Sequence, residues 1–264
     1  RASESLYANH RDEHGLFFVP WADDPKTLWG IFRWWFFDDN PYEKGEPPQI
    51  PSVANDGAYL AGQARSSSVT WVGHATFAVH DGDDVFLTDP HFTKRAFIPT
   101  RAAPPGIPIE AVPDDAFAVI SHNHYDHLDR TSVKQLQARF GREILWFVPN
   151  GIAAWLRKLG VERIIELGWW QSEYHGQVEA FCLPAQHFSG RGPGDHNQTL
   201  WCSWRLNFPD FSLYFAGDTG YAPLFTEIGD IFGPVDLALL PIGAYEPRWF
   251  MSPVHINPAE AVTI

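Results

Sequence analysis

The 264 residues are enough for one large domain or two small ones, and 45% hydrophobic residues allow a sizeable buried core. The formal net charge of −13 argues against a general nucleic-acid binder, because affinity for a phosphate backbone depends on clustered Lys and Arg. Cys182 and Cys202 lack CxxC spacing, so we expect two small buried residues rather than a disulfide framework or a thiolate zinc site.

No stretch approaches the ~20 apolar residues that cross a bilayer. The chain opens on Arg1 and its only methionine is Met251, so we expect the natural N-terminus, with any targeting segment, to lie upstream. A soluble or peripheral membrane protein is expected, with the cytoplasm favoured and the compartment otherwise open.

Residues 1–66 are rich in aromatic residues and proline and are predicted to form an extension that packs on a main domain at 67–264. An apolar stripe with helical spacing runs through the extension at Leu28, Ile31, Phe32, Trp35 and Phe36. Packing of this stripe on the main body is favoured over its use as an interfacial membrane anchor, because basic residues near it are few.

From Val69 onward the pattern changes to strands separated by turns and short helices. "VTWVGHATFAV" and "DVFLTD" predict a hairpin around "HDGDD", and "DRTSVKQLQARFG" predicts a helix that stops at Gly141. Further strands are expected within 116–121, 143–148, 163–167, 177–183, 199–208, 211–218 and 237–242. The pattern indicates a layered α/β or α+β domain with polar residues at the strand ends.

The last residues predict the start of another helix. Asn257 is suited to the cap position, Pro258 to the first turn and Glu260 to the third helical position. Because the chain stops about two turns later, we expect the C-terminus to be truncated and more of the fold to follow.

The segment "VISHNHYDHLD" places His122, His124, Asp126 and His127 directly after an apolar strand. Imidazole and carboxylate together suit Zn²⁺ and its first-row neighbours. One catalytic ion usually takes three protein ligands, so four candidates on one loop raise the expectation of two ions that share a bridging hydroxide. No Ser or Cys lies in a GxSxG elbow, and Ser121 is expected to support the loop.

Two later strand ends offer further ligands, His187 in "LPAQHFSG" and Asp218 in "LYFAGDTG". Glycines on both sides of the GDTG aspartate would allow a close approach. Asp89 in "FLTDP" is expected to orient a ligand histidine from behind. For His74, the same supporting role and a buried core position are equally open.

These motifs resemble the metallo-β-lactamase superfamily, whose fold is a four-layer αββα sandwich with a dinuclear zinc site. The segments "WVGHATFAV", "WFVPNG", "IGAYEPRWFM" and "HINPAEAV" narrow the resemblance to the N-acylphosphatidylethanolamine-hydrolysing phospholipase D branch and its bacterial relatives. The resemblance extends from about Trp71 to the end of the chain.

The resemblance implies a ligand set for two Zn²⁺ ions. One ion would be held by His122, His124 and His187, the other by Asp126 and His127, and both by Asp218. The family pattern also has a late histidine on the second zinc, and no histidine follows His255 here. We expect truncation to account for this; if the polypeptide ended at Ile264, the second site and activity would be in doubt.

The resemblance further implies a zinc-dependent phosphodiesterase that releases phosphatidic acid from N-acylphosphatidylethanolamine or related phospholipids through a metal-bridging hydroxide. Asp126, Asp218 and His255 would be catalytic, with His255 and Tyr125 also contacting substrate. Arg248 and Trp249 would be structural or line the entrance. The expected partners are a phospholipid or other phosphodiester and a membrane surface contacted peripherally, with no nucleic acid and the oligomeric state open.

Two other functions fit the same residues. "GHATF" and "SHNHYDHLD" also fit a metal-dependent lactonase or carboxylic ester hydrolase. A metal-binding membrane-surface protein without turnover is the third reading, based on the missing late histidine and the aromatic N-terminal segment.

Overall fold

The computed structural model describes residues 7–22, 30, 33–34, 51, 53–58, 60, 67–82, 84–114 and 116–264. The predicted apolar stripe, Leu28, Ile31, Phe32, Trp35 and Phe36, lies outside them.

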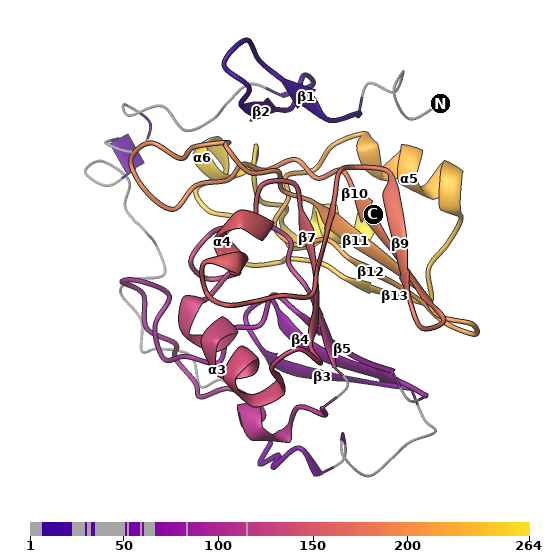
Figure 1. The fold of residues 1–264 in the computed structure, drawn as a ribbon. Helices are drawn as coiled ribbons and strands as arrows, with labels where there is room; N and C mark the ends of the chain where they lie inside the picture. The colour runs from indigo at the N-terminus through magenta and orange to yellow at the C-terminus, as the bar shows by residue number, and fades with distance from the viewer. Residues whose placement is uncertain are drawn as a thin grey trace.

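Two sheets form the body of the protein (Figure 1). The six-stranded sheet has the order β3-β4-β5-β6-β7-β8, with antiparallel pairs from β3 to β5 and parallel pairs from β5 to β8. Its strands are β3 (Ser68–Gly73), β4 (Thr76–Asp81), β5 (Asp84–Thr88), β6 (Phe117–Val119), β7 (Leu145–Pro149) and β8 (Ile164–Leu167).

The five-stranded sheet has the order β13-β12-β11-β10-β9. It is antiparallel except where β12 pairs with β13. Its strands are β9 (Gln171–His175), β10 (Val178–Leu183), β11 (Ser203–Asn207), β12 (Ser212–Phe215) and β13 (Leu237–Leu239).

The described residues also form helices between and after these strands. They are α3 (Arg130–Phe140), α4 (Ala153–Arg157), α5 (Leu224–Phe232), α6 (Arg248–Met251) and α7 (Pro258–Thr263), with a 3₁₀ turn at Ile109–Ala111. The Asp129 side chain caps α3 by accepting from the Ser132 amide, and Gly141 ends that helix. Asn257 and Glu260 form a capping box at the start of α7, as predicted.

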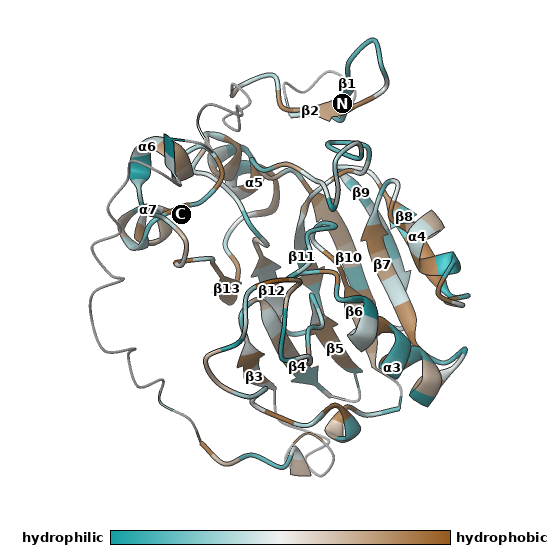
Figure 2. Ribbon diagram, turned by 90° about the vertical axis from the view of Figure 1, so that its left-hand side faces the viewer, coloured by the Kyte–Doolittle hydropathy of each residue, from teal (hydrophilic) through white to brown (hydrophobic). Residues whose placement is uncertain are grey.

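Side chains alternate between the two faces of each strand, and the buried apolar residues form three clusters. On β5, Phe86 faces the other sheet, whereas Val85 and Leu87 face the helical side. The cluster between the sheets continues with residues such as Trp204, and the cluster outside the six-stranded sheet includes Leu136 of α3. Figure 2 shows brown, hydrophobic segments along strands of both sheets.

The third cluster packs α5 on the outer face of the five-stranded sheet through Leu224 and Ile228. The order of layers is therefore α3 and α4, first sheet, second sheet, α5. This arrangement confirms the predicted αββα sandwich.

Near the N-terminus, β1 (His10–Arg11) and β2 (Phe17–Phe18) form a small antiparallel pair. Phe17 joins the cluster between the sheets, and Trp21 Nε1 donates to Gln186 Oε1 at 3.0 Å. These contacts concern residues 7–22 only, and the division of the chain at residue 66 stays a prediction.

Two strand predictions differ from the structure, and one strand was missed. The run "VTWVGHATFAV" is two strands, because Gly73 (φ 128°) and His74 (φ 52°) turn the chain between β3 and β4. Strand β11 begins at Ser203, four residues after the predicted start of its segment. Strand β9 was not predicted at all. Within the described part of the chain, no helix is both long and apolar enough to cross a membrane.

Candidate metal centre

The polar residues singled out in the sequence lie just beyond the ends of four strands. Ser121 and the histidine motif follow β6, and Asp89 follows β5. His187 follows β10 of the other sheet, and Asp218 follows β12. The two sheets therefore bring these loops together at one end of the sandwich.

Three imidazoles converge to form the first group of candidate ligands, His122, His124 and His187. His124 Nδ1 lies 2.7 Å from His122 Nε2 and 3.3 Å from His187 Nε2. The His187 Nδ1–H donates to the Val254 carbonyl at 3.1 Å, which leaves the lone pair on Nε2 facing the group. His122 is held the same way, since its Nδ1 contacts Ser121 Oγ at 2.8 Å.

Asp126 and His127 form a second group, which His74 also joins. His74 Nε2 lies 2.9 Å from Asp126 Oδ2, and its side chain is 49% exposed. The alternative of a buried core position for His74 is therefore not what the structure has. Its imidazole is placed to orient Asp126 or to serve as a ligand itself.

Asp218 lies between the two groups. Its Oδ2 is 3.2 Å from His127 Nε2 and 3.8 Å from His187 Nε2. Gly217 (φ 60°) makes this approach possible, because a Cβ at that position would lie 2.5 Å from the Ser121 Cβ. The glycine thus permits close contact between two loops, and the predicted close approach to a cation stays a prediction.

A buried network supports the motif from behind. Asp89 Oδ2 accepts from His127 Nδ1 at 2.6 Å and from Ser121 Oγ at 2.5 Å, and Asp89 Oδ1 accepts from the Ser121 amide at 2.7 Å. Asp89 therefore holds the proton of His127 on Nδ1 and turns the Nε2 lone pair toward Asp218. The Asp89 and His127 side chains are fully buried.

The electrostatics of the first group favour neutral imidazoles. Burial lowers the pKa of His122 and His187 well below the ordinary value, and it lowers the pKa of His124 to about 4. Neutral imidazole is the form that binds metal.

The second group favours a positive charge. Burial acts to lower the pKa of His127, but neighbouring carboxylates, Asp218 first, override it and hold that pKa well above its ordinary value. Burial likewise acts to raise the pKa of Asp218, and the charge of His127 instead holds it well below its usual range. A cation beside these carboxylates would supply the charge that His127 otherwise carries.

The surroundings of one atom, His127 Nε2, show whether the candidate ligands fit a metal ion. His127 Nε2 is buried and has no hydrogen-bond partner among the described residues, although two carboxylate oxygens lie nearby. A buried polar atom without a partner is costly. A cation shared by His127 Nε2 and those oxygens would satisfy it, so the donor set fits a metal.

Arg191 was not predicted from the sequence, and it braces the motif loop. Its Nη1 donates to the carbonyls of Asn123 and Leu128, both at 2.7 Å. Its guanidinium also covers the Tyr125 ring at 4.1 Å, and the Tyr125 hydroxyl donates to the Arg191 carbonyl at 2.6 Å. No local pattern in the sequence reveals a clamp made to backbone carbonyls.

His255 lies next to the candidate metal centre, and Arg248 holds its backbone in place. His255 Nδ1 is 3.9 Å from Asp218 Oδ2, which places this imidazole at the edge of the metal groups. Arg248 donates to the His255 carbonyl at 3.0 Å and binds both carboxylate oxygens of Glu260, at 2.8 and 2.9 Å. Of its two predicted roles, Arg248 therefore has the structural one. Trp249 is 42% exposed and lies against Arg33.

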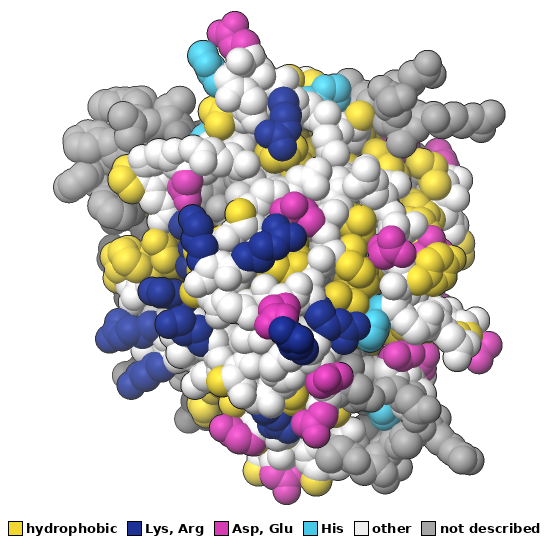
Figure 3. Space-filling view, viewed as in Figure 1, with side chains coloured by type: hydrophobic (Ala, Val, Ile, Leu, Met, Phe, Trp, Pro, Cys, Tyr) yellow, Lys and Arg dark blue, Asp and Glu magenta, His cyan; other side chains and the backbone are white. Residues whose placement is uncertain are grey.

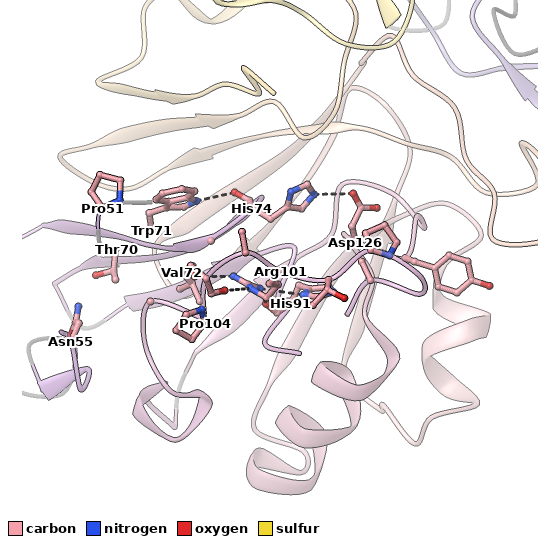
Figure 4. A pocket seen from close by; sticks show the side chains of 18 of the residues that line it. Pro51, Asn55, Thr70, Trp71, Val72, His74, His91, Arg101, Pro104 and Asp126 are labelled. Carbon is pink, nitrogen blue, oxygen red and sulfur yellow. Dashed lines mark hydrogen bonds and ion pairs between the residues drawn. The ribbon is translucent and has the colours of Figure 1, made fainter. Parts of the chain in front are cut away.

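A cavity of about 780 Å³ opens beside the centre. Its walls are mainly apolar and come from β3, the loop around 96–106 and the motif loop, including Trp71, Phe97 and Tyr125. Figure 4 shows His74 reaching Asp126 at one end of this cavity, while Arg101 contacts His91 and the Val72 carbonyl along its floor. Tyr125, which was predicted to contact substrate, lines this cavity, whereas its other walls were not predicted from the sequence.

Comparison with known proteins finds relatives whose names describe phospholipases D that hydrolyse N-acyl-phosphatidylethanolamine. A chain described as "N-acyl-phosphatidylethanolamine-hydrolyzing phospholipase D 1" of Caenorhabditis elegans is 44% identical over 74% of this chain and 59% of the relative. One described as "N-acyl-phosphatidylethanolamine-hydrolyzing phospholipase D, mitochondrial" of Saccharomyces cerevisiae is 37% identical over 74% of this chain and 44% of the relative. The chain thus spans about three fifths or less of the length of these relatives.

The solved structure of Igni18, a metallo hydrolase from the archaeon Ignicoccus hospitalis, has the same fold. Its TM-score is 0.56 at 21% identity, over 75% of this chain and 76% of that one. A family model described as "Beta-lactamase superfamily domain" matches residues 85–264. The chain therefore belongs to the β-lactamase superfamily.

Proposed function

We propose that this chain carries the catalytic centre of a zinc-dependent phosphodiesterase of the phospholipase D type. Its substrate would be N-acylphosphatidylethanolamine or a related phospholipid, and its lipid product phosphatidic acid. The printed names of the worm and yeast relatives support this proposal, and so does an apolar cavity next to the motif loop.

The observation that carries the proposal is the position of Asp218. One carboxylate lies within 4 Å of an imidazole nitrogen from each of the two groups of candidate ligands. A group in that position is suited to bridge two ions. His122, His124 and His187 would hold one ion, Asp126 and His127 would hold the other, and Asp218 would serve both.

When bound, two such ions would supply an acidified water as nucleophile and offset the charge that develops on the phosphoryl oxygens. Imidazole and carboxylate ligands alone do not separate zinc from iron or manganese. Metal content measured after purification from cells, together with activity restored by each ion to the stripped protein, tests the assignment of zinc.

The residues of the chain would perform the remaining tasks. His255, beside Asp218, would donate a proton to the leaving alcohol or a hydrogen bond to a phosphoryl oxygen. Tyr125 would contribute its ring rather than its hydroxyl to the substrate cavity, because the hydroxyl is already committed to Arg191. Asp89 would keep His127 in the ligating tautomer.

The cavity favours a lipid over a small polar substrate. Its lining is mainly apolar, and it reaches His124 and Asp126. A phospholipid can place acyl chains against such walls while its phosphodiester meets the candidate ligands. A membrane surface would then be the source of substrate, and the net charge of −13 disfavours nucleic-acid diesters.

The test is product identification by mass spectrometry with zinc-loaded protein. N-acylphosphatidylethanolamine, phosphatidylethanolamine and a panel of lactones are offered separately, and phosphatidic acid is expected from the phospholipids. Asp218→Asn should lower the rate by at least about a hundredfold, since a ligand charge is lost. Asp230→Asn, an exposed site on α5, is the matched control.

Intact phosphodiesters alongside opened lactones would overturn the proposal and select the lactonase alternative. Turnover of neither class by metal-loaded protein would select a metal-binding protein without catalysis.

A further inference from the structure

We propose that the loop Lys94–Arg101, called here the apical loop, docks the protein on an anionic lipid surface beside the cavity. This inference rests on the proposed function, because it names the surface from which a phospholipid would enter. It involves other residues than the apolar stripe of the N-terminal extension, for which packing was favoured over a membrane anchor.

The apical loop is a closed turn. It is fastened across its base by a bridge between Arg95 and Thr100 and by the Arg101 amide donating to the Lys94 carbonyl at 2.9 Å. At its apex, the Ala96 amide donates to the Pro99 carbonyl at 3.0 Å. These contacts fix which side chains the turn presents.

The turn presents two adjacent apolar side chains to solvent. Phe97 is 68% exposed and Ile98 is 71% exposed. Phe97 also stacks on Tyr125 of the motif loop, with ring centroids 4.8 Å apart, whereas Ile98 is not among the residues that line the cavity. Trp71, which lines the same cavity, is 55% exposed. An isolated exposed apolar residue is ordinary, but a rigid apolar apex at a cavity mouth marks an interaction site.

The charge around the apex identifies the partner. Lys94 and Arg95 are exposed within the apical loop, and Arg130 and Lys134 are exposed on α3. The amide of Phe92, just before the loop, donates to Ser132 of α3 at 2.7 Å, so the loop and the helix are joined. Figure 3 shows Lys and Arg side chains gathered beside hydrophobic ones at the left of this face, where Figure 1 draws α3.

The chain as a whole is acidic, with a net charge of −13, so this group of exposed Lys and Arg side chains is a local exception to the overall charge. Apolar side chains that enter the acyl boundary, flanked by cations at headgroup level, are the requirements for binding an anionic bilayer. Phe97 and Tyr125 then form a continuous apolar path from the bilayer to Asp126.

Co-sedimentation with vesicles tests the docking. Phosphatidylcholine vesicles are compared with vesicles that also contain phosphatidylglycerol, and the wild-type chain should partition preferentially onto the anionic ones. Ile98→Ser should reduce partitioning about tenfold. Lys94→Gln and Arg95→Gln should each reduce it about fivefold on anionic vesicles. Ile231→Ser, 55% exposed on α5, is the matched control and should bind as wild type.

Hydrolysis of a short-chain, monomeric phosphatidylethanolamine separates docking from catalysis. Ile98→Ser should retain wild-type activity on this monomer and lose activity on vesicles. Equal vesicle binding by wild type and Ile98→Ser overturns the docking proposal even when the monomer is hydrolysed. Vesicle binding through the apical loop without hydrolysis of any phosphodiester supports docking and overturns the proposed function. A change of oligomeric state in Ile98→Ser, with no change in vesicle binding, assigns the loop to a contact between copies.

Discussion

Replacing Asp89 by Asn tests whether the tautomer of His127 governs occupancy of the centre. The carboxylate accepts the His127 Nδ1–H at 2.6 Å and both donors of Ser121. In Asp89→Asn, one oxygen can still serve the Ser121 amide, but an NH₂ group then faces His127. The proton of His127 is expected to move to Nε2, which blocks the atom that faces Asp218.

The size of the effect follows from two contributions. Loss of a supporting carboxylate usually weakens metal affinity by about 10- to 100-fold, or about 1.4 to 2.7 kcal/mol. Loss of a hydrogen bond to a charged group should also lower the free energy of unfolding by about 1.5 to 3 kcal/mol. The first effect concerns the loaded protein, and the second should persist after chelation.

Competition between the protein and a calibrated chelator measures affinity for Co²⁺ or Zn²⁺, and urea denaturation of the stripped protein measures stability. Asp236→Asn is the matched control, because that exposed carboxylate accepts from the Ser212 amide and hydroxyl, both at 2.8 Å. Wild-type metal affinity in Asp89→Asn, within twofold, would refute the reasoning about the tautomer.

Three further predictions follow from the same region. Gly217→Ala should lower the free energy of unfolding by at least about 2 kcal/mol, because at this positive φ the new Cβ would lie 2.5 Å from the Ser121 Cβ. Thermal denaturation measures the loss, and Gly229→Ala, where a Cβ would meet nothing within 4 Å, is the control. A loss no greater than in Gly229→Ala would contradict this prediction. Arg191→Gln should lower kcat on a monomeric diester at least about tenfold, because the hydrogen bonds from Arg191 to the motif loop are lost. Arg191→Lys should restore part of the activity. Equal kcat in the wild type and both variants would exclude a positioning role. Chelation should abolish activity and lower the melting temperature by several degrees, with both restored by Zn²⁺; scanning calorimetry that shows no shift would argue against a metal in the native protein.

The presence of the buried strands is well predicted by the sequence because burial leaves a continuous apolar signal. Phe117 to Val119 is buried on both faces, and the polar motif begins at Ser121, two residues after the strand ends. Helix signals are equally local, as the caps at Asp129 and Asn257 show. Such features depend on residues that are close together in the sequence, so they can be predicted from a single sequence.

The features that sequence reasoning missed depend on partners that are distant along the chain. Strand β9 is largely exposed and carries polar residues, so only its pairing with β10 makes it a strand. The turn at His74 interrupts a run that reads as continuous, and its imidazole meets Asp126 from 52 residues away. The clamp made by Arg191 bridges more than 60 residues to backbone atoms, which carry no sequence signal.

Two buried indoles connect the core to the candidate ligands. Trp204 Nε1 donates to the Ile120 carbonyl at 2.9 Å, and Trp201 Nε1 donates to the Ala185 carbonyl at 2.9 Å. Each acceptor lies two residues before a candidate ligand histidine, His122 in one case and His187 in the other. The spacing between the two loops is thus set by the packed interior.

Ion binding to such a preassembled centre costs little reorganisation, unlike binding to a metal-dependent finger that folds around its zinc. The chain is expected to reach its native fold before it is loaded, and to exchange one ion for another without unfolding. Adaptation to a different metal supply could then proceed through the ligands alone, with the architecture unchanged.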